Sequence, residues 1–215
     1  MPFRLLSAIA LVIASLLLIA ACGGSDNSTP DGVSEVQTLF EGATLSGDTV
    51  GNADAPVEVV EYLDVQCPFC KQASEDILPT LLEQANEGKI KVVARPVTVI
   101  GPASTLGARG AAAAAEQDQA WPFVETLFKA QGAENSGWVT EELMRNVVTD
   151  LGLDVEAWDT ALAGSSEQAV NANQRLAQSD GLTGVPFFKV TGPGGTRDVA
   201  QADLNAVNAA IDEVS

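Results

Sequence analysis

The sequence predicts an α/β fold in which a βαβ half and a ββα half share one sheet, with a block of helices inserted between them. Three observations predict it. Segments rich in β-branched residues begin near residues 57, 90 and 186, a helical pattern follows the first of them at once, and 102–181 contains only helical patterns. A strand, helix and second strand favour a parallel pair with a right-handed crossover. The last two strands suit an antiparallel hairpin covered by a final helix.

The first 21 residues have the pattern of an export signal. Arg4 provides a positive charge, residues 5–21 are almost entirely apolar, and small residues precede Cys22. The segment resembles a bacterial lipoprotein signal peptide, which implies that Cys22 becomes acylated (for example with palmitate) and anchors the chain to the bacterial cell membrane. The alternatives are an ordinary export signal and an uncleaved anchor, since a membrane span needs at least about 17 residues and this segment just reaches that length. Either way the domain lies outside the cytoplasm, where disulfides persist.

Residues 22–44 are predicted to be a flexible tether. Its first part, 23–32, contains only small and polar residues and has no apolar side chain to bury. Residues 45–215 are then expected to form one folded domain, with the helical insertion at about 102–181.

The first half of this domain consists of a strand, a helix and a strand. Residues 57–63 have the composition of a largely buried strand. From Pro68 the apolar spacing becomes helical, and Pro79 should kink this helix by removing the hydrogen bond to the carbonyl of Glu75. Strand character returns over 89–100.

Apolar spacing and turn residues predict the helices and strands of the insertion and of the second half. Ser165 and Gln168 have the spacing of a capping box that opens the last helix of the insertion. Helices are expected at 111–115, 121–129, 140–151, 154–164 and 165–180, short strands at 186–191 and 197–200, and a final amphipathic helix at 201–214.

Composition excludes several classes of function. The chain has 11 Lys and Arg against 29 Asp and Glu, so its formal net charge is −18, which argues against binding nucleic acid. It contains no histidine, which excludes Ser-His and Cys-His nucleophile pairs and any histidine metal site.

Cys67 and Cys70 form a Cys-X-X-Cys motif where a strand pattern changes to a helix pattern. Pro68 suits the first helical position, so the unpaired N–H groups at the helix start should favour a Cys67 thiolate. Cys70 lies one turn further in. We therefore expect Cys67 to be the exposed nucleophile and Cys70 the buried resolving thiol. A zinc site is disfavoured because no second cysteine pair or histidine is present, whereas a structural disulfide remains an alternative.

Several motifs resemble those of DsbA-like thiol–disulfide oxidoreductases of the thioredoxin superfamily. They lie at 51–56, 61–66, 67–70, 121–128 and 181–186, and the resemblance covers roughly 45–215. It implies a thioredoxin-like fold and a redox-active disulfide, Cys67–Cys70, in place of an external cofactor or metal.

The resemblance also implies roles for four further residues. Pro186 matches a cis-proline facing the disulfide, and Val185 would offer its backbone to a substrate chain; an ordinary turn is the alternative. Glu61 matches a buried acid that handles the proton of Cys70, although a glutamate reaching water is also possible. Phe69 is a candidate substrate contact. Because its side chain brings no charge to the Cys67 thiolate, the Cys67–Cys70 couple should be less oxidising than that of relatives with histidine at this position.

The sequence thus predicts an extracytoplasmic, membrane-tethered enzyme that forms disulfides in exported proteins by exchange through Cys67. The expected partners are exported cysteine-containing proteins and a quinone-linked membrane oxidoreductase. The alternatives are an isomerase or reductant of the same fold, and a non-enzymatic peptide-binding lipoprotein with a structural disulfide.

Overall fold

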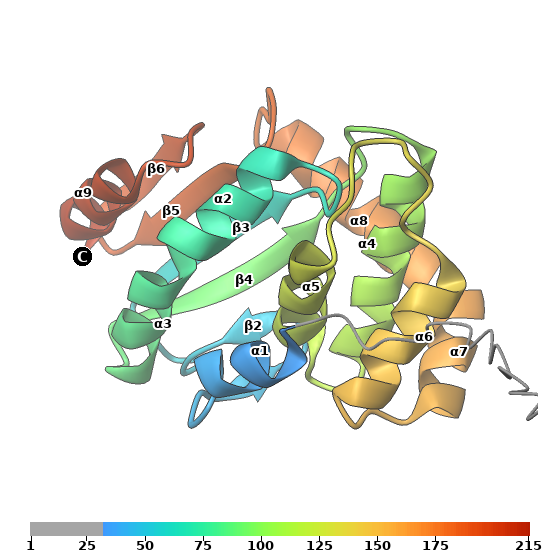
Figure 1. The fold of residues 1–215 in the computed structure, drawn as a ribbon. Coiled ribbons are helices and arrows are strands. Elements are labelled where there is room, and N and C mark those ends of the chain that lie inside the picture. Colours follow the sequence, from blue (N-terminus) through green and yellow to red (C-terminus); the bar gives the residue numbers. More distant parts are fainter. Residues whose placement is uncertain (1–31) are drawn as a thin grey trace, which may run out of the picture.

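The computed structural model describes residues 32–215, so the predicted export signal, Cys22 and the start of the predicted tether lie outside the described residues. In the described part, a six-stranded sheet has the order β1-β2-β4-β3-β5-β6 (Figure 1). The elements are α1 (Val33–Leu39), β1 (Leu45–Ser46), β2 (Thr49–Val50), β3 (Val57–Leu63), α2 (Pro68–Asp76), α3 (Leu78–Asn86), β4 (Ile90–Pro96), α4 (Pro102–Ala115), α5 (Ala120–Lys129), α6 (Glu141–Asp150), α7 (Val155–Ala163), α8 (Ser166–Ser179), β5 (Phe187–Gly192), β6 (Gly195–Val199) and α9 (Leu204–Val214).

The central strand β3 joins the two halves of the fold. It pairs in parallel with β4 and antiparallel with β5, so that Glu61 lies between Ala94 and Phe188. The predicted βαβ and ββα halves, and hence the thioredoxin-like α/β fold, are confirmed. The hairpin of β1 and β2, which the sequence analysis missed, extends the sheet beyond β4.

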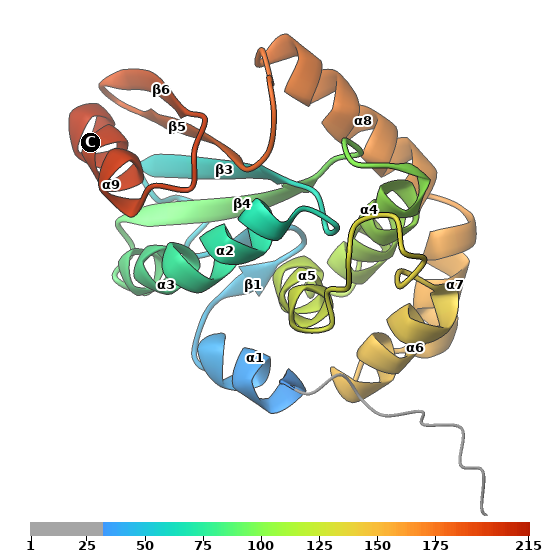
Figure 2. The same ribbon diagram turned by 45° about the horizontal axis from the view of Figure 1, so that its top comes forward.

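Different helices cover the two faces of the sheet (Figure 2). Val59 and Leu63 belong to the core cluster that contains the buried residues of α2, α3 and α9. Val60 and Tyr62 belong to a second cluster with Ala177 of α8. Because side chains alternate along a strand, Glu61 shares the face of Val59 and Leu63 and is directed toward α2.

Buried indole groups hold the helices of the insertion to one another and to the sheet. Trp121 Nε1 donates a hydrogen bond of 3.1 Å to the carbonyl of Val92 in β4, and Trp158 Nε1 donates one of 3.0 Å to the carbonyl of Gly110 in α4. Since both indoles are buried, each needs a partner of this kind. The insertion is therefore held against the same core as the cysteine pair.

The predicted tether at 22–44 is wrong over its second part. Residues 33–39 form α1, in which Val33 and Val36 are buried, and Phe40 is buried directly after it. Apolar side chains three and four residues apart give a short helix one buried face, and α1 packs against α5. The hairpin strand β1 then begins at Leu45.

Two other boundaries differ from the prediction. The helix expected from Pro68 is divided at Ile77 into α2 and α3, so that Pro79 lies in the first turn of α3, where its missing N–H costs little. The strand expected over 89–100 ends at Pro96, because the N–H groups of Val99 and Ile100 instead bond a side chain near the cysteines.

The predicted capping box at Ser165 is also wrong. The Ser165 hydroxyl donates a hydrogen bond to the carboxylate of Glu116 and makes no capping bond to α8. A tertiary partner has displaced the local one.

Candidate active site

Cys67 and Cys70 lie at the start of α2, as the sequence predicted. Cys67 is the N-cap residue, with extended backbone angles of φ −76° and ψ 119°, and Pro68 opens the helix. Cys70 is fully buried, but Cys67 is only 3% exposed. The expectation of an exposed nucleophile is therefore wrong in degree.

The two thiols have opposite pKa shifts. A hydrogen bond from the Cys70 thiol lowers the pKa of Cys67 to about 7, and the peptide N–H groups of Cys70 and Phe69 act in the same direction against the effect of burial. Burial raises the pKa of Cys70 well above its usual value, and its contact with Cys67 and the charge of Glu61 raise it further. The helix start therefore favours a Cys67 thiolate and a protonated Cys70.

The loop before β5 faces the Cys67 sulfur. The Val185–Pro186 peptide bond is cis, as the resemblance implied. The Cys67 Sγ lies 3.6 Å from the carbonyl oxygen of Val185, which accepts a hydrogen bond from the thiol. Segments 118 residues apart in the chain thus meet at the reactive sulfur.

A shallow depression of about 300 Å³ adjoins this loop. It is lined by Phe69, Gln72, Val185, Pro186 and residues 200–202. Phe69 is 63% exposed, which is unusual for a side chain of this size, and it projects beside the cysteine pair. The predicted substrate contacts therefore share one surface.

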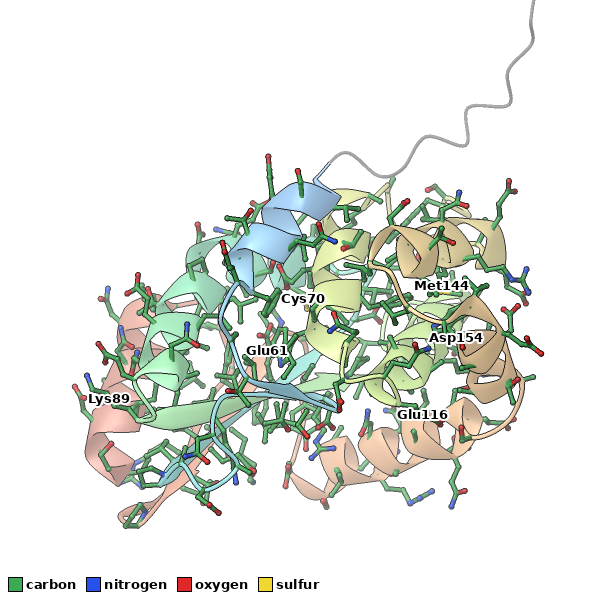
Figure 3. All side chains as sticks on the ribbon, turned by 90° about the horizontal axis from the view of Figure 1, so that it is seen from below. Glu61, Cys70, Lys89, Glu116, Met144 and Asp154 are labelled. Atoms are coloured by element: carbon green, nitrogen blue, oxygen red, sulfur yellow. The ribbon has the colours of Figure 1, made fainter. Side chains whose placement is uncertain are left out.

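Glu61 lies behind the disulfide position, on the face of the sheet that packs against α2. It is 2% exposed, so the alternative of a glutamate reaching water is excluded. Burial, and to a smaller extent the charge of Glu125, raise the pKa of Glu61 well above its usual value. Figure 3 shows Glu61 and Cys70 in the interior of the molecule, and the charge of Glu61 acts on the Cys70 thiol.

Polar side chains that the sequence analysis did not single out hold the segment before Cys67. The buried carboxylate of Asp64 accepts hydrogen bonds from the N–H groups of Gln66, Val99 and Ile100, at 2.8–2.9 Å. Gln131 Nε2 donates to the carbonyls of Val65 and Cys67, at 2.8 and 3.1 Å.

Two further contacts fix this segment from the insertion. The Gln66 side chain donates to the Ser104 hydroxyl and accepts from the N–H of Asn135. A Cβ on Gly107 of α4 would stand 2.4 Å from Val65 Cγ2, so glycine allows α4 to approach this segment closely. The sequence signal was weak, since only the polar residues at the end of a buried strand marked the site.

Glu125 was also missed. It is 3% exposed on α5, and its Oε2 accepts a hydrogen bond from the Ser74 hydroxyl of α2. Burial raises the pKa of Glu125 to about 7, although the bond from Ser74 and the charge of Lys129 lower it. The signal that could have found it is a carboxylate within a mostly apolar helix, Ala120–Lys129.

Comparison with known proteins shows which family this fold and cysteine pair belong to. A family model described as thioredoxin matches residues 44–213. The probable disulfide bond formation protein D of Bacillus anthracis is 32% identical over 171 residues, which are 77% of this chain and 76% of that protein. The thiol-disulfide exchange protein α-DsbA2 from Wolbachia pipientis has a TM-score of 0.65 at 26% identity, covering 88% of this chain and 97% of that one. BdbD from Bacillus subtilis shares the fold, with a TM-score of 0.69 at 24% identity, covering 80% and 97%.

The family match spans most of the chain, and the cysteine pair occupies the strand-to-helix junction of the matched fold. The chain therefore belongs to the thioredoxin family, and it is a DsbA-like thiol–disulfide oxidoreductase.

Proposed function

We propose that this oxidoreductase forms disulfides in exported proteins, outside the cytoplasm, while a lipid on Cys22 tethers it to the membrane. The observation that carries the direction of exchange is the contrast between the two thiols: the pKa of Cys67 is lowered to about 7 and that of Cys70 is raised. A stabilised Cys67 thiolate favours the reduced pair, which makes the Cys67–Cys70 disulfide a better oxidant. The described residues include no helix long and apolar enough to cross a membrane.

The first step is attack by a client thiolate on the Cys67 sulfur of the disulfide. The new bond joins the client sulfur to Cys67, and the Cys67–Cys70 bond breaks with its electron pair going to Cys70. Because burial disfavours a Cys70 thiolate, that sulfur takes up a proton. Glu61 is the proposed donor, since it is buried behind Cys70 with its carboxyl pKa raised.

The second step releases the client. A second client thiolate attacks the client sulfur of the mixed disulfide, and Cys67 leaves as a thiolate stabilised by the Cys70 thiol and the first N–H groups of α2. The client loses two electrons and gains a disulfide, while the Cys67–Cys70 pair gains those electrons.

The client chain is proposed to bind along the loop before β5. The Val185 backbone lies beside the Cys67 sulfur, and Pro186 and Phe69 line the adjoining depression. An extended peptide could take a backbone hydrogen bond from this loop and place an apolar side chain against the exposed ring of Phe69.

Reoxidation closes the cycle. A quinone-linked membrane oxidoreductase is the proposed partner, accepting the two electrons from the reduced pair. The tether at Cys22 would keep the domain near such a partner and raise its effective concentration there.

The reduction potential of the pair tests the direction of exchange. The whole chain, purified in detergent, is equilibrated with glutathione buffers, and the thiols are counted by alkylation. A value near or above about −180 mV is expected for an oxidant, whereas a value near the −270 mV or so of thioredoxin would identify a reductant and contradict the proposal.

Trapping tests the role of each cysteine. Cys70→Ser should accumulate mixed disulfides between Cys67 and exported proteins, because no resolving thiol remains. Cys67→Ser is the matched control and should trap nothing. Equal adduct yields from both variants would contradict the assignment of Cys67 as the nucleophile.

A further inference from the structure

Two buried carboxyl groups behind the cysteine pair have oxygens without partners. Among the described residues, Glu61 Oε1 of β3 and Glu125 Oε1 of α5 are buried and accept no hydrogen bond. A buried polar atom without a partner destabilises a protein by about 1–3 kcal/mol. Packing alone gives no reason for two such groups, so a functional reason has to be considered.

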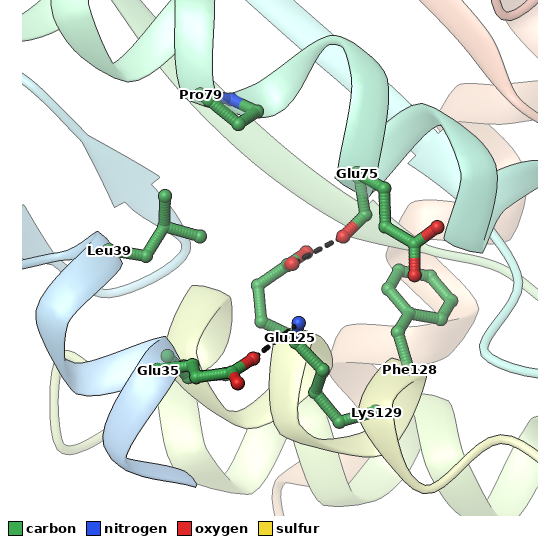
Figure 4. A pocket seen from close by; sticks show the side chains of 9 residues that line it. Glu35, Leu39, Glu75, Pro79, Glu125, Phe128 and Lys129 are labelled. Atoms are coloured by element: carbon green, nitrogen blue, oxygen red, sulfur yellow. Dashed lines mark hydrogen bonds and ion pairs between the residues drawn. The ribbon is translucent and has the colours of Figure 1, made fainter. Parts of the chain in front are cut away.

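Glu125 borders a pocket that opens to the outside of the domain. The pocket has a volume of about 230 Å³ and lies between α1, α2, α3 and α5. Figure 4 shows Glu125 in this pocket. Its carboxylate accepts a hydrogen bond from the Ser74 hydroxyl of α2. A water molecule occupies about 30 Å³ in the liquid, so the pocket has room for several, and the Glu125 carboxyl gives them a polar partner.

Charged groups line the pocket on α1, α2 and α5, whereas α3 contributes only Pro79. Lys129 of α5 forms an ion pair of 3.0 Å with Glu35 of α1, and Glu75 of α2 is exposed at the rim. The charge of Lys129 lowers the pKa of Glu125, while Glu75 raises it. The effects of Lys129 and Glu75 on this pKa oppose each other. Burial is the largest effect, and it raises the pKa of Glu125 to about 7 although the bond from Ser74 lowers it.

The two buried carboxyl groups and the Cys70 thiol are coupled electrostatically, each to the next. The charge of Glu125 acts on Glu61, and the charge of Glu61 acts on the Cys70 thiol. These couplings give the order Cys70, Glu61, Glu125 and the pocket that Glu125 lines. Each of these groups favours its protonated form, as a path that carries protons requires.

We propose that Glu125, held by Ser74, is the outer stage of a proton path that connects Glu61 and the Cys70 thiol with water in the pocket under α1. This inference rests on the exchange reaction proposed above.

The proton balance is simple. When the Cys67–Cys70 bond breaks, Cys70 leaves with the electron pair and takes a proton from the Glu61 carboxyl. The Glu61 carboxylate is reprotonated by Glu125, directly or through one water, and Glu125 takes a proton from pocket water. When the pair is reoxidised, the same proton moves outward, and no electrons travel along the path.

The test is the pH dependence of disulfide reduction. The whole chain, oxidised and in detergent, is reduced with dithiothreitol between pH 5 and 9, and each rate constant is divided by the fraction of the reagent present as thiolate. In the wild type the corrected rate should fall above a pH of about 7, where Glu125 loses its proton. Glu125→Gln should lower the rate about tenfold below pH 7 and remove this inflection.

Two further variants separate the proton path from a structural role. Glu83→Gln removes the same charge from an exposed position on α3 and should leave the profile unchanged. Glu125→Ala enlarges the pocket, and acetate, a small carboxylic acid, should restore its rate in proportion to concentration without accelerating the wild type.

The outcomes are distinguishable. An unchanged profile in Glu125→Gln, or acetate acting equally on wild type and Glu125→Ala, would overturn the proton path while leaving the exchange function intact. A wild-type disulfide that does not react with dithiothreitol would contradict the exchange function itself.

Discussion

The two cysteines lie one helical turn apart, yet their surroundings differ in every respect that matters for their chemistry. Cys67 faces the Val185 carbonyl and the depression beside Phe69, and the N–H groups of the α2 start surround it. Cys70 faces the interior, with Glu61 behind it. The pKa of the first thiol is lowered and that of the second is raised. These surroundings agree with the proposed roles, in which Cys67 is the nucleophile and Cys70 is the thiol that holds and releases a proton.

The largest expected effect is on the pH dependence of folding stability, and it comes from the buried carboxyl of Glu125. Burial raises the pKa of Glu125 from 4.5 to about 7, so between these values the folded protein binds more protons than the unfolded one. Stability should therefore fall as pH rises from about 4.5 to 7, and this carboxyl accounts for on the order of 3 kcal/mol of the loss. Urea unfolding of wild type and Glu125→Gln across this range measures the difference, with Glu83→Gln as the control. Parallel stability curves for wild type and Glu125→Gln would show that Glu125 is ionised in the folded state.

The next effect compares the thiols directly. In the reduced protein at pH 7, iodoacetamide should alkylate Cys67 more than about a hundredfold faster than Cys70, because about half of Cys67 but little of Cys70 is thiolate. Peptide mass spectrometry after timed quenching gives both rates in one sample. Similar rates would remove the distinction between a reactive and a resolving thiol.

A smaller effect tests the inner carboxyl. Glu61→Gln should slow reduction of the disulfide by dithiothreitol about tenfold at pH 7, since Cys70 loses its proton donor. Glu58→Gln on the same strand is the matched control, because Glu58 is part of the opposite face of β3 and pairs with Lys91 at 3.6 Å. If both variants slow the reaction alike, the effect comes from net charge and not from proton transfer.

The smallest expected effect is that of residue 69 on the pKa of Cys67. Phe69→His places a hydrogen-bond donor next to the helix start and should lower the pKa of Cys67 by about half a unit, roughly a threefold change in the thiolate-to-thiol ratio. Thiolate absorbance at 240 nm during a pH titration measures it. Gln72→His, further along α2, should shift the Cys67 titration less. A larger shift in that control would mean that general charge, and not the position between the cysteines, sets the pKa.

Local patterns predicted much of the fold because neighbouring residues decide them. The strand at 57–63 agrees with β3, and the five helices of the insertion lie close to their predicted places. Failures occurred where a distant partner replaced a local one. Ser165 bonds Glu116 instead of capping its helix, and Asp64 takes the N–H groups that would have extended β4.

The same division applies to the site. Cys67, Cys70 and the Val185–Pro186 loop were found from motif and resemblance, and the structure brings them together. Asp64, Gln131 and Glu125 were not found, since each acts on residues between 2 and 66 positions away and no spacing in the chain marks them. Cys22 lies outside the described residues, and its lipidation stays a prediction.

The sequence by itself determined the α/β class, the order of the halves and the insertion, and the Cys-X-X-Cys at a strand-to-helix junction, because these depend on periodicity and on residues that adjoin in the chain. Only the tertiary structure decided that Cys67 is nearly enclosed, that Glu61 is buried, that α1 belongs to the domain, and that Glu125 lies behind the cysteines. Burial and electrostatic coupling depend on distances in space, and packing brings together groups that the chain keeps apart.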